Sequence, residues 1–118
     1  MNYTKLKLKD KEIGLKFGMV SDRYLSEKLA GGYCFNGDDI TEIGLAHIIY
    51  GGYINNCALK DIAPELTFEQ VVDFIEESIN DSDTMLAIGA VVKVWSDVQI
   101  ARNGGEESKK KTTKKLKS

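Results

Sequence analysis

Polar and apolar residues alternate through residues 3–17, and this pattern predicts an N-terminal β-hairpin with its turn near Asp10. One face of the two strands is apolar, and lysines and a glutamate occupy most of the other. The apolar positions are Leu6, Leu8, Ile13, Leu15 and Phe17. Because an isolated hairpin is only marginally stable in water, this face must pack against another element.

After the hairpin the apolar residues recur every three to four positions, which predicts helices. Helix-start signals accompany the pattern: Ser21 is a candidate N-cap, Asp39 with Glu42 forms a candidate capping box, and Thr67 with Gln70 forms a second one. The predicted helices cover about residues 22–30, 40–60, 68–79 and 84–102. The β-branched residues of the last segment would also suit a strand, but the alternation of a strand is absent, so we predict a helix there.

The predicted helix of residues 40–60 is apolar around most of its circumference. A surface this broad implies burial on more than one side, either in the core or against a partner. Its glycines, Gly44, Gly51 and Gly52, each weaken a helix by up to ~1 kcal/mol relative to alanine. We therefore expect them to permit a kink, a close backbone approach or a division of the helix in two.

These elements predict an α+β, mainly α fold, in which the N-terminal β-hairpin is followed by a bundle of about four helices. We expect residues 1–103 to form a single globular domain. Residues 104–118 lose all apolar periodicity and are rich in lysine, so a disordered or loosely ordered basic tail is predicted.

The composition agrees with this picture: of 118 residues, 42% are hydrophobic and 29% charged, which suits one ordinary core. Cys34 and Cys57 lack metal-site spacing and stand near apolar neighbours, so a reduced, buried pair is expected. No secretory signal begins the chain, and no apolar run approaches the ~20 residues of a membrane span. A cytoplasmic protein without a membrane segment is expected.

The formal charge of −2 conceals an asymmetry. Residues 1–103 hold ten Lys/Arg and sixteen Asp/Glu, whereas residues 104–118 hold six lysines and two glutamates. An acidic body beside a basic tail favours association between identical chains, and a homo-oligomer is expected.

No pattern of residues supports catalysis. His47 is the only histidine and falls within the apolar helix, without the partners that a metal site or a triad requires. The glycines lack the spacing of a phosphate loop, and the acids near Asp39 lack the ligand spacing of a calcium loop. The sequence therefore predicts a protein that is not an enzyme, with no metal and no cofactor.

The lysine tail is the one feature with an evident electrostatic role. Lys109, Lys110 and Lys111 begin a run that would solubilise the chain, bind a partner protein or neutralise nucleic-acid phosphates in a salt-dependent way. Base stacking is not expected, because no aromatic residue lies among the lysines.

Three segments together resemble the tail assembly chaperones of long-tailed bacteriophages and prophages. They are Ile13-Gly14-Leu15-Lys16-Phe17-Gly18, the run Gly44-Leu45-Ala46-His47-Ile48-Ile49-Tyr50-Gly51-Gly52-Tyr53, and the capped Leu66-Thr67-Phe68-Glu69 start with Val72-Asp73. The resemblance covers about residues 4–100, and its motifs are hydrophobic and structural rather than chemical.

This resemblance implies a non-enzymatic role in the host cytoplasm: such chaperones bind the helical tape measure protein, keep it soluble and help recruit the tail tube protein. A chaperone for an apolar helix needs an exposed or exposable apolar surface. Leu45, Ile49 and Tyr53 are the predicted partner-binding residues of the body, with core packing as the alternative for each. The alternative function is that of a small nucleic-acid-associated regulator that uses the lysine tail.

Overall fold

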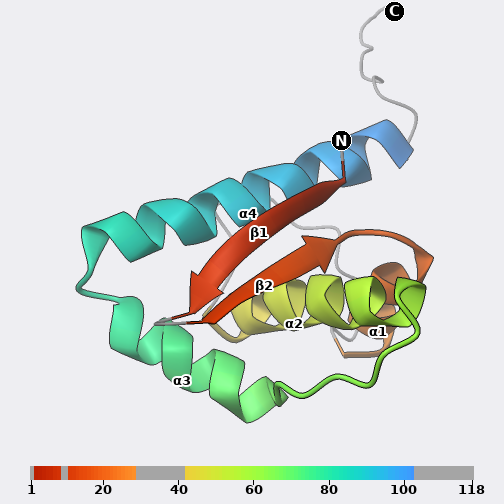
Figure 1. The fold of residues 1–118 in the computed structure, drawn as a ribbon. Helices are drawn as coiled ribbons and strands as arrows, with labels where there is room; N and C mark the ends of the chain where they lie inside the picture. Colours follow the sequence, from red (N-terminus) through yellow and green to blue (C-terminus); the bar gives the residue numbers. More distant parts are fainter. Residues whose placement is uncertain (1, 9–10, 29–41, 103–118) are drawn as a thin grey trace, which may run out of the picture.

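The computed structural model describes residues 2–8, 11–28 and 42–102 (Figure 1). In these residues an antiparallel hairpin is followed by four helices, which confirms the predicted α+β, mainly α fold. The elements are β1 (Tyr3–Leu8), β2 (Lys11–Lys16), α1 (Met19–Lys28), α2 (Glu42–Leu59), α3 (Phe68–Ser78) and α4 (Ser82–Arg102). The features predicted between residues 29 and 41, with Cys34 among them, and the tail of residues 104–118 lie outside the described residues.

The hairpin buries the apolar face that its alternation predicts. Its register places Leu6 opposite Ile13 and Thr4 opposite Leu15, so that the apolar residues of the two strands share one side. That side is covered by helices, with β2 against α2 and β1 against α4 (Figure 1). The buried apolar residues of the hairpin and the four helices form one cluster, so the described residues share a single core.

Helix α1 begins three residues earlier than predicted, at Met19 rather than residue 22. The reason is that Ser21 caps the helix from inside its first turn. The Oγ of Ser21 accepts a hydrogen bond from the backbone N–H of Gly18 (2.9 Å) and donates to its carbonyl (2.8 Å). The backbone N–H of Ser21 in turn donates to Oδ1 of Asn55 (3.0 Å), which ties the start of α1 to α2.

Helix α2 runs without interruption through Gly51 and Gly52, so these glycines permit close approach rather than a break. A Cβ at position 52 would lie 2.8 Å from Cε1 of Phe17 and 3.2 Å from Cβ of Leu15. At position 51 it would lie 3.2 Å from Cδ2 of Tyr24. The helix packs against β2, α1 and α3, which confirms the expectation of burial on more than one side.

Helix α2 ends at Leu59, one residue before the predicted end, and the geometry of this end is specific. Asp61 has a positive φ of 57°, the N–H of Ile62 donates to the carbonyl of Cys57 (3.0 Å), and the N–H of Asp61 donates to that of Ala58 (3.2 Å). This is the Schellman arrangement, in which Asp61 takes the place that glycine usually occupies. The helix therefore ends before Pro64 is reached.

Helix α3 starts at its predicted cap, whereas α4 starts slightly earlier than predicted. Thr67 and Gln70 form the expected capping box, with reciprocal hydrogen bonds of 2.8 and 3.2 Å. Helix α4 begins at Ser82, two residues before the predicted start, because Asp81 caps it. The carboxylate of Asp81 accepts hydrogen bonds from the backbone N–H groups of Asp83 and Thr84 and from Oγ1 of Thr84 (2.6 Å). The bond from Oγ1 of Thr84 lowers the pKa of Asp81, and the two backbone bonds lower it further. The whole of Ser82–Arg102 is helical, so the strand alternative is excluded.

Two glycine substitutions test the close approach of α2 to the hairpin. We expect Gly52→Ala to cost a net ~1–2 kcal/mol of stability, because the methyl group overlaps the buried Phe17 and Leu15. Gly89→Ala is the matched control: nothing lies within 4 Å of its Cβ position, so helix propensity alone should add up to ~1 kcal/mol. Urea unfolding measures both, and equal effects of the two substitutions would contradict the close-approach argument.

Candidate functional site

The three predicted partner-binding residues of the body lie in or against the core. Ile49 is fully buried, Tyr53 is 8% exposed, and Leu45 is partly buried against the core cluster. The Tyr53 hydroxyl also accepts hydrogen bonds from the backbone N–H groups of Glu65 (2.9 Å) and Leu66 (3.1 Å). In this structure these residues pack the interior, as the alternative interpretation held. Lys109, Lys110 and Lys111 lie outside the described residues.

His47 belongs to an aromatic cluster between α1, α2 and α3. Its ring stacks on Phe68, with centroids 4.4 Å apart and planes at 17°. Its Nδ1 lies 2.8 Å from the hydroxyl oxygen of Tyr24, and the ring of Tyr50 contacts both Tyr24 and Phe68. The imidazole thus joins three helices through stacking and one hydrogen bond.

The pKa values of His47 and Tyr24 in this cluster are shifted so that both side chains stay neutral over a wider pH range. Burial lowers the pKa of His47, and the nearby charge of Lys28 lowers it further. Burial raises the pKa of Tyr24 to about 12, helped by Tyr50 and Glu69. A phenol with so high a pKa keeps its proton at neutral pH, so Tyr24 is poorly suited to act as a base.

The described part of the chain contains no group of three or more His, Cys, Asp or Glu side chains that could hold a metal ion. Cys57 is buried with a free thiol, as expected for that residue.

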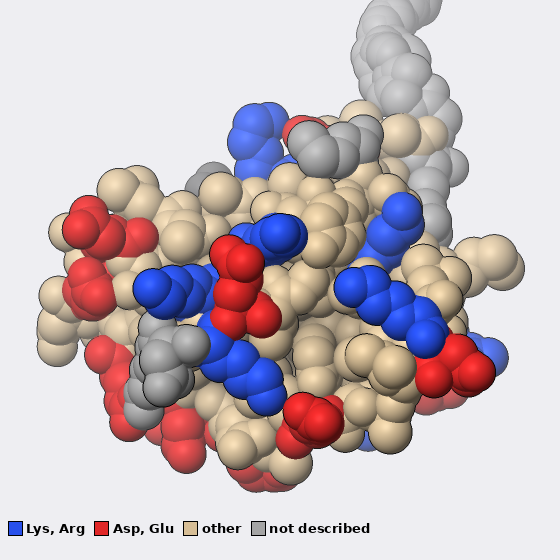
Figure 2. All heavy atoms as spheres, viewed as in Figure 1, with Lys and Arg blue, Asp and Glu red and all other residues tan. Residues whose placement is uncertain are grey.

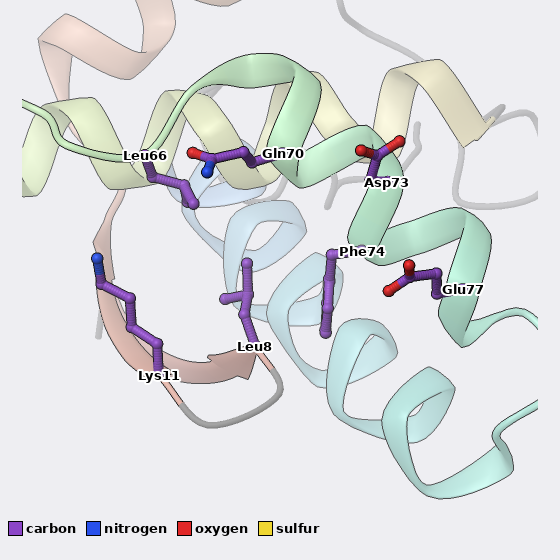
Figure 3. Close-up of a pocket in the computed structure, with 7 residues that line it drawn as sticks. All are labelled: Leu8, Lys11, Leu66, Gln70, Asp73, Phe74 and Glu77. Carbon is purple, nitrogen blue, oxygen red and sulfur yellow. The ribbon is translucent and has the colours of Figure 1, made fainter.

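A groove of about 350 Å³ separates the end of the hairpin from α3 (Figure 3). Leu8 and Phe74 point into this space from the two sides, and Leu66 extends the apolar floor. The rim is polar and mixed in charge. It consists of Lys11 on β2 and of Gln70, Asp73 and Glu77 on α3.

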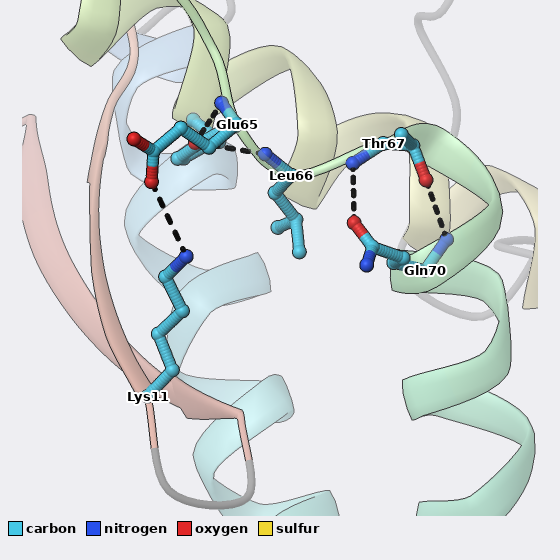
Figure 4. Close-up of polar contacts among 6 residues, drawn as sticks. Lys11, Glu65, Leu66, Thr67 and Gln70 are labelled. Atoms are coloured by element: carbon cyan, nitrogen blue, oxygen red, sulfur yellow. Dashed lines mark hydrogen bonds and ion pairs between the residues drawn. The ribbon is translucent and has the colours of Figure 1, made fainter.

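Polar contacts fix the segment that forms one end of this groove (Figure 4). The two N–H bonds to the Tyr53 hydroxyl hold residues 65 and 66 against α2, and the capping box then starts α3. Nζ of Lys11 lies 3.7 Å from Oε1 of Glu65. Since both side chains of that pair are exposed, the ion pair contributes at most ~1 kcal/mol. The groove is therefore positioned mainly by the hydrogen bonds.

Exposed apolar side chains gather where α2 begins, α3 ends and α4 begins. A hollow of about 170 Å³ is lined by Ile43, Val72, Ile75 and Glu76. A second, open hollow of about 500 Å³ is lined by Ile79, Asn80, Ser82, Met85 and Leu86. Ile75 of the first hollow and Ile79 of the second are one helical turn apart. We call the apolar residues of this surface, Ile43, Val72, Ile79, Met85 and Leu86, the apolar band.

Three members of the apolar band are large apolar side chains that are substantially exposed. Leu86 is 73% exposed, Ile43 is 50% exposed and Ile79 is 43% exposed. Contiguous apolar patches of this kind mark interaction sites in soluble proteins.

Acidic residues surround this end of the molecule. Helix α3 carries Glu69, Asp73, Glu76 and Glu77 and no lysine or arginine, and Asp81 and Asp83 follow at the start of α4. Figure 2 shows the acidic groups over α3 and the start of α4, whereas the basic groups gather over the hairpin. A partner that presents apolar residues flanked by basic ones would match this end.

Helix α4 is the only candidate membrane span within the described ranges. By length and composition Ser82–Ala101 is long and apolar enough, which corrects the expectation that no run approaches that length. This is a weak indication, since core helices of soluble proteins meet the same criterion. Its inner face packs in the core through Ile88, Val91, Trp95 and Val98.

What the described residues define is a small α+β domain with an apolar band, an acidic end and a shallow groove. Comparisons of the chain with protein-family models, with curated proteins and with solved structures find no match.

Sequence reasoning placed the binding surface on α2 and did not select the apolar band. The exposed residues come from three helices, and their proximity depends on the packing of α3 and α4, which a helical period does not encode. A signal was nevertheless present: Leu86 lies away from the main apolar face of its helix, where a solvated helix would carry a polar residue.

The pH dependence of stability tests the environment of His47. Because its folded-state pKa lies below the 6.5 of a free imidazole, the unfolded chain binds this proton more readily than the folded chain. We expect its contribution to stability to be present above pH ~6.5 and to be lost as the pH falls from there toward the folded-state pKa. As the only histidine, His47 gives a single imidazole signal in an NMR titration.

Carboxylates also titrate in acid, so the contribution of His47 is taken as the difference between the wild type and His47→Gln. A folded-state pKa above 6.5, with the wild type gaining stability on acidification relative to His47→Gln, would show that the ring is held in its charged form instead.

Proposed function

We propose that this protein is a non-enzymatic assembly chaperone of a long-tailed phage or prophage, which binds the tape measure protein and assists assembly of the tail tube around it. The observation that carries the proposal is the apolar band, whose three most exposed members come from three helices. The hairpin and capped-helix motifs that resemble this chaperone family agree with it.

The geometry of the band suits a helical client. Its residues extend from the start of α2 along α3 to the start of α4, and an amphipathic helix can lay its apolar face along such a surface. The carboxylates of α3 and of Asp81 and Asp83 lie beside it, so a client helix with basic flanks gains electrostatic steering. Nucleic acid would be repelled from this end by the same charges.

The expected affinity is modest, which fits a chaperone that must leave the assembly. Complete burial of a leucine or isoleucine side chain contributes about 1.5–3 kcal/mol, and the exposed members of the band are already partly buried. Association also costs translational and rotational freedom, so a few such anchors give reversible binding.

Co-expression with a tape measure protein tests the proposal. We expect the wild type to keep the tape measure protein soluble and to purify with it. Leu86→Asp should weaken the complex about tenfold or more, because it removes the most exposed anchor of the band and places a charge there. Binding is measured by calorimetry with a soluble tape measure fragment.

The matched control is Leu59→Asp, which makes the same change at a residue that is 65% exposed on α2, outside the apolar band. It should leave binding unchanged. If neither the wild type nor the control forms a complex or improves solubility, the chaperone proposal fails. Nucleic-acid binding that falls steeply with salt and disappears on truncation after residue 105 would favour the regulator instead.

A further inference from the structure

Helix α4 has an apolar inner face that is buried, whereas its opposite side is exposed and carries both apolar and charged residues. The inner face carries Ile88, Val91, Trp95 and Val98, which are all buried. On the opposite side an outer stripe recurs at steps of four and three residues. It consists of Leu86, Ala90, Lys93, Asp97 and Ile100, and all five are exposed.

This spacing places the outer stripe along one line of the helix, as in the contact seam of a pair of helices. Leu86 is 73% exposed and Ile100 is 55% exposed, so large apolar side chains stand near the two ends of the line. Between them Nζ of Lys93 lies 3.2 Å from Oδ2 of Asp97. The outer stripe thus combines exposed apolar side chains near its ends with a pair of opposite charges at its middle, and a second helix with the complementary order of residues could match it.

We propose that α4 pairs in antiparallel orientation with α4 of a second copy of this chain, through Ala90, Lys93, Asp97 and Ile100. This proposal does not depend on the proposed function. It assigns a surface to the homo-oligomer that the charge distribution of the sequence predicts.

Charge complementarity selects both the occupant and the register. When the two-fold axis passes at the level of residue 95, Lys93 of each copy faces Asp97 of the other, and Ala90 faces Ile100. Together with the Lys93–Asp97 pair within each chain, four charges then alternate in sign around the axis. A register centred on Lys93 or on Asp97 would instead bring like charges together, which is unfavourable.

On either side of the charged pairs this register also places a small residue, Ala90, opposite a large one, Ile100, which favours it further. Ala90 leaves room for Ile100 of the second copy, and the symmetry repeats the contact on the other side of the axis. A single pair of helices buries less than the ~1,200 Å² of a standard stable interface, so we expect a concentration-dependent monomer–dimer equilibrium.

Charge reversal with complementary mixing tests the interface in the full chain, by sedimentation velocity. Lys93→Asp and Asp97→Lys each place like charges across the axis, and each should weaken the dimer about tenfold or more. An equimolar mixture of the two variants should restore dimers, because the aspartates of one then face the lysines of the other. If Lys93 and Asp97 only stabilised the fold of a single chain, mixing the two variants would not restore dimers.

The control is Asp73→Lys, which makes the same charge change as Asp97→Lys on the exposed side of α3. It should leave the equilibrium unchanged, and circular dichroism checks that every variant keeps its helices. The proposal is overturned if the wild type stays monomeric at its highest soluble concentration, or if the mixture does not recover dimers. It is also overturned if the wild type binds to lipid vesicles through α4 instead of dimerising.

Because Leu86→Asp and the Lys93 and Asp97 variants alter different residues, the two proposals fail separately. A Lys93 or Asp97 variant that loses dimers but still binds the tape measure fragment bears on the α4 interface alone. A Leu86→Asp variant that loses this binding but still dimerises bears on the apolar band alone.

Discussion

The structure depends on the close contact between β2 and α2 at Gly52. A two-stranded hairpin has too little surface to be stable by itself, so its apolar face has to be covered closely. Phe17 and Leu15 approach the backbone of α2 to distances that any side chain at position 52 would violate. The same helix then fixes its neighbours, α1 through Asn55 and the start of α3 through the hydroxyl of Tyr53. Strand β2, α1 and α3 are thus positioned directly against α2, and β1 is held through β2 and α4.

This central role explains why the middle of α2 is buried, whereas Ile43 at its start stays exposed and belongs to the apolar band. Its broad apolar stripe packs against the hairpin and two helices, so the side chains of Ile49 and Tyr53 are buried. Apolar residues remain exposed where the packing around α2 runs out, at the ends of α3 and α4. A small domain with one helix at its centre exposes apolar side chains on the elements that cover that helix, and here these are Ile79 and Leu86.

Much of the fold could be predicted from local signals. The alternation of the hairpin, the capping box of Thr67 and the breadth of the α2 stripe each depend on residues close in sequence, and the structure contains them as expected. The details of the helix ends could not be predicted. Ser21 lies inside the first turn of α1, where it bonds to Gly18 and to the distant Asn55, and Asp61 gave no sign that it would adopt a positive φ. The apolar band was missed because residues from three separate helices build it.

The two proposed surfaces are compatible with each other because of their positions along α4. An axis at the level of residue 95 lies nine residues from Leu86, or about 13 Å at 1.5 Å per residue. Two-fold symmetry would therefore place the apolar bands of a dimer at opposite ends of the helix pair, at least ~27 Å apart along it. Neither band would be covered by the second copy, and a long helical client could contact both. Two weak contacts on one client raise the overall affinity by effective concentration, while each remains weak enough to be displaced in turn as tail tube subunits arrive.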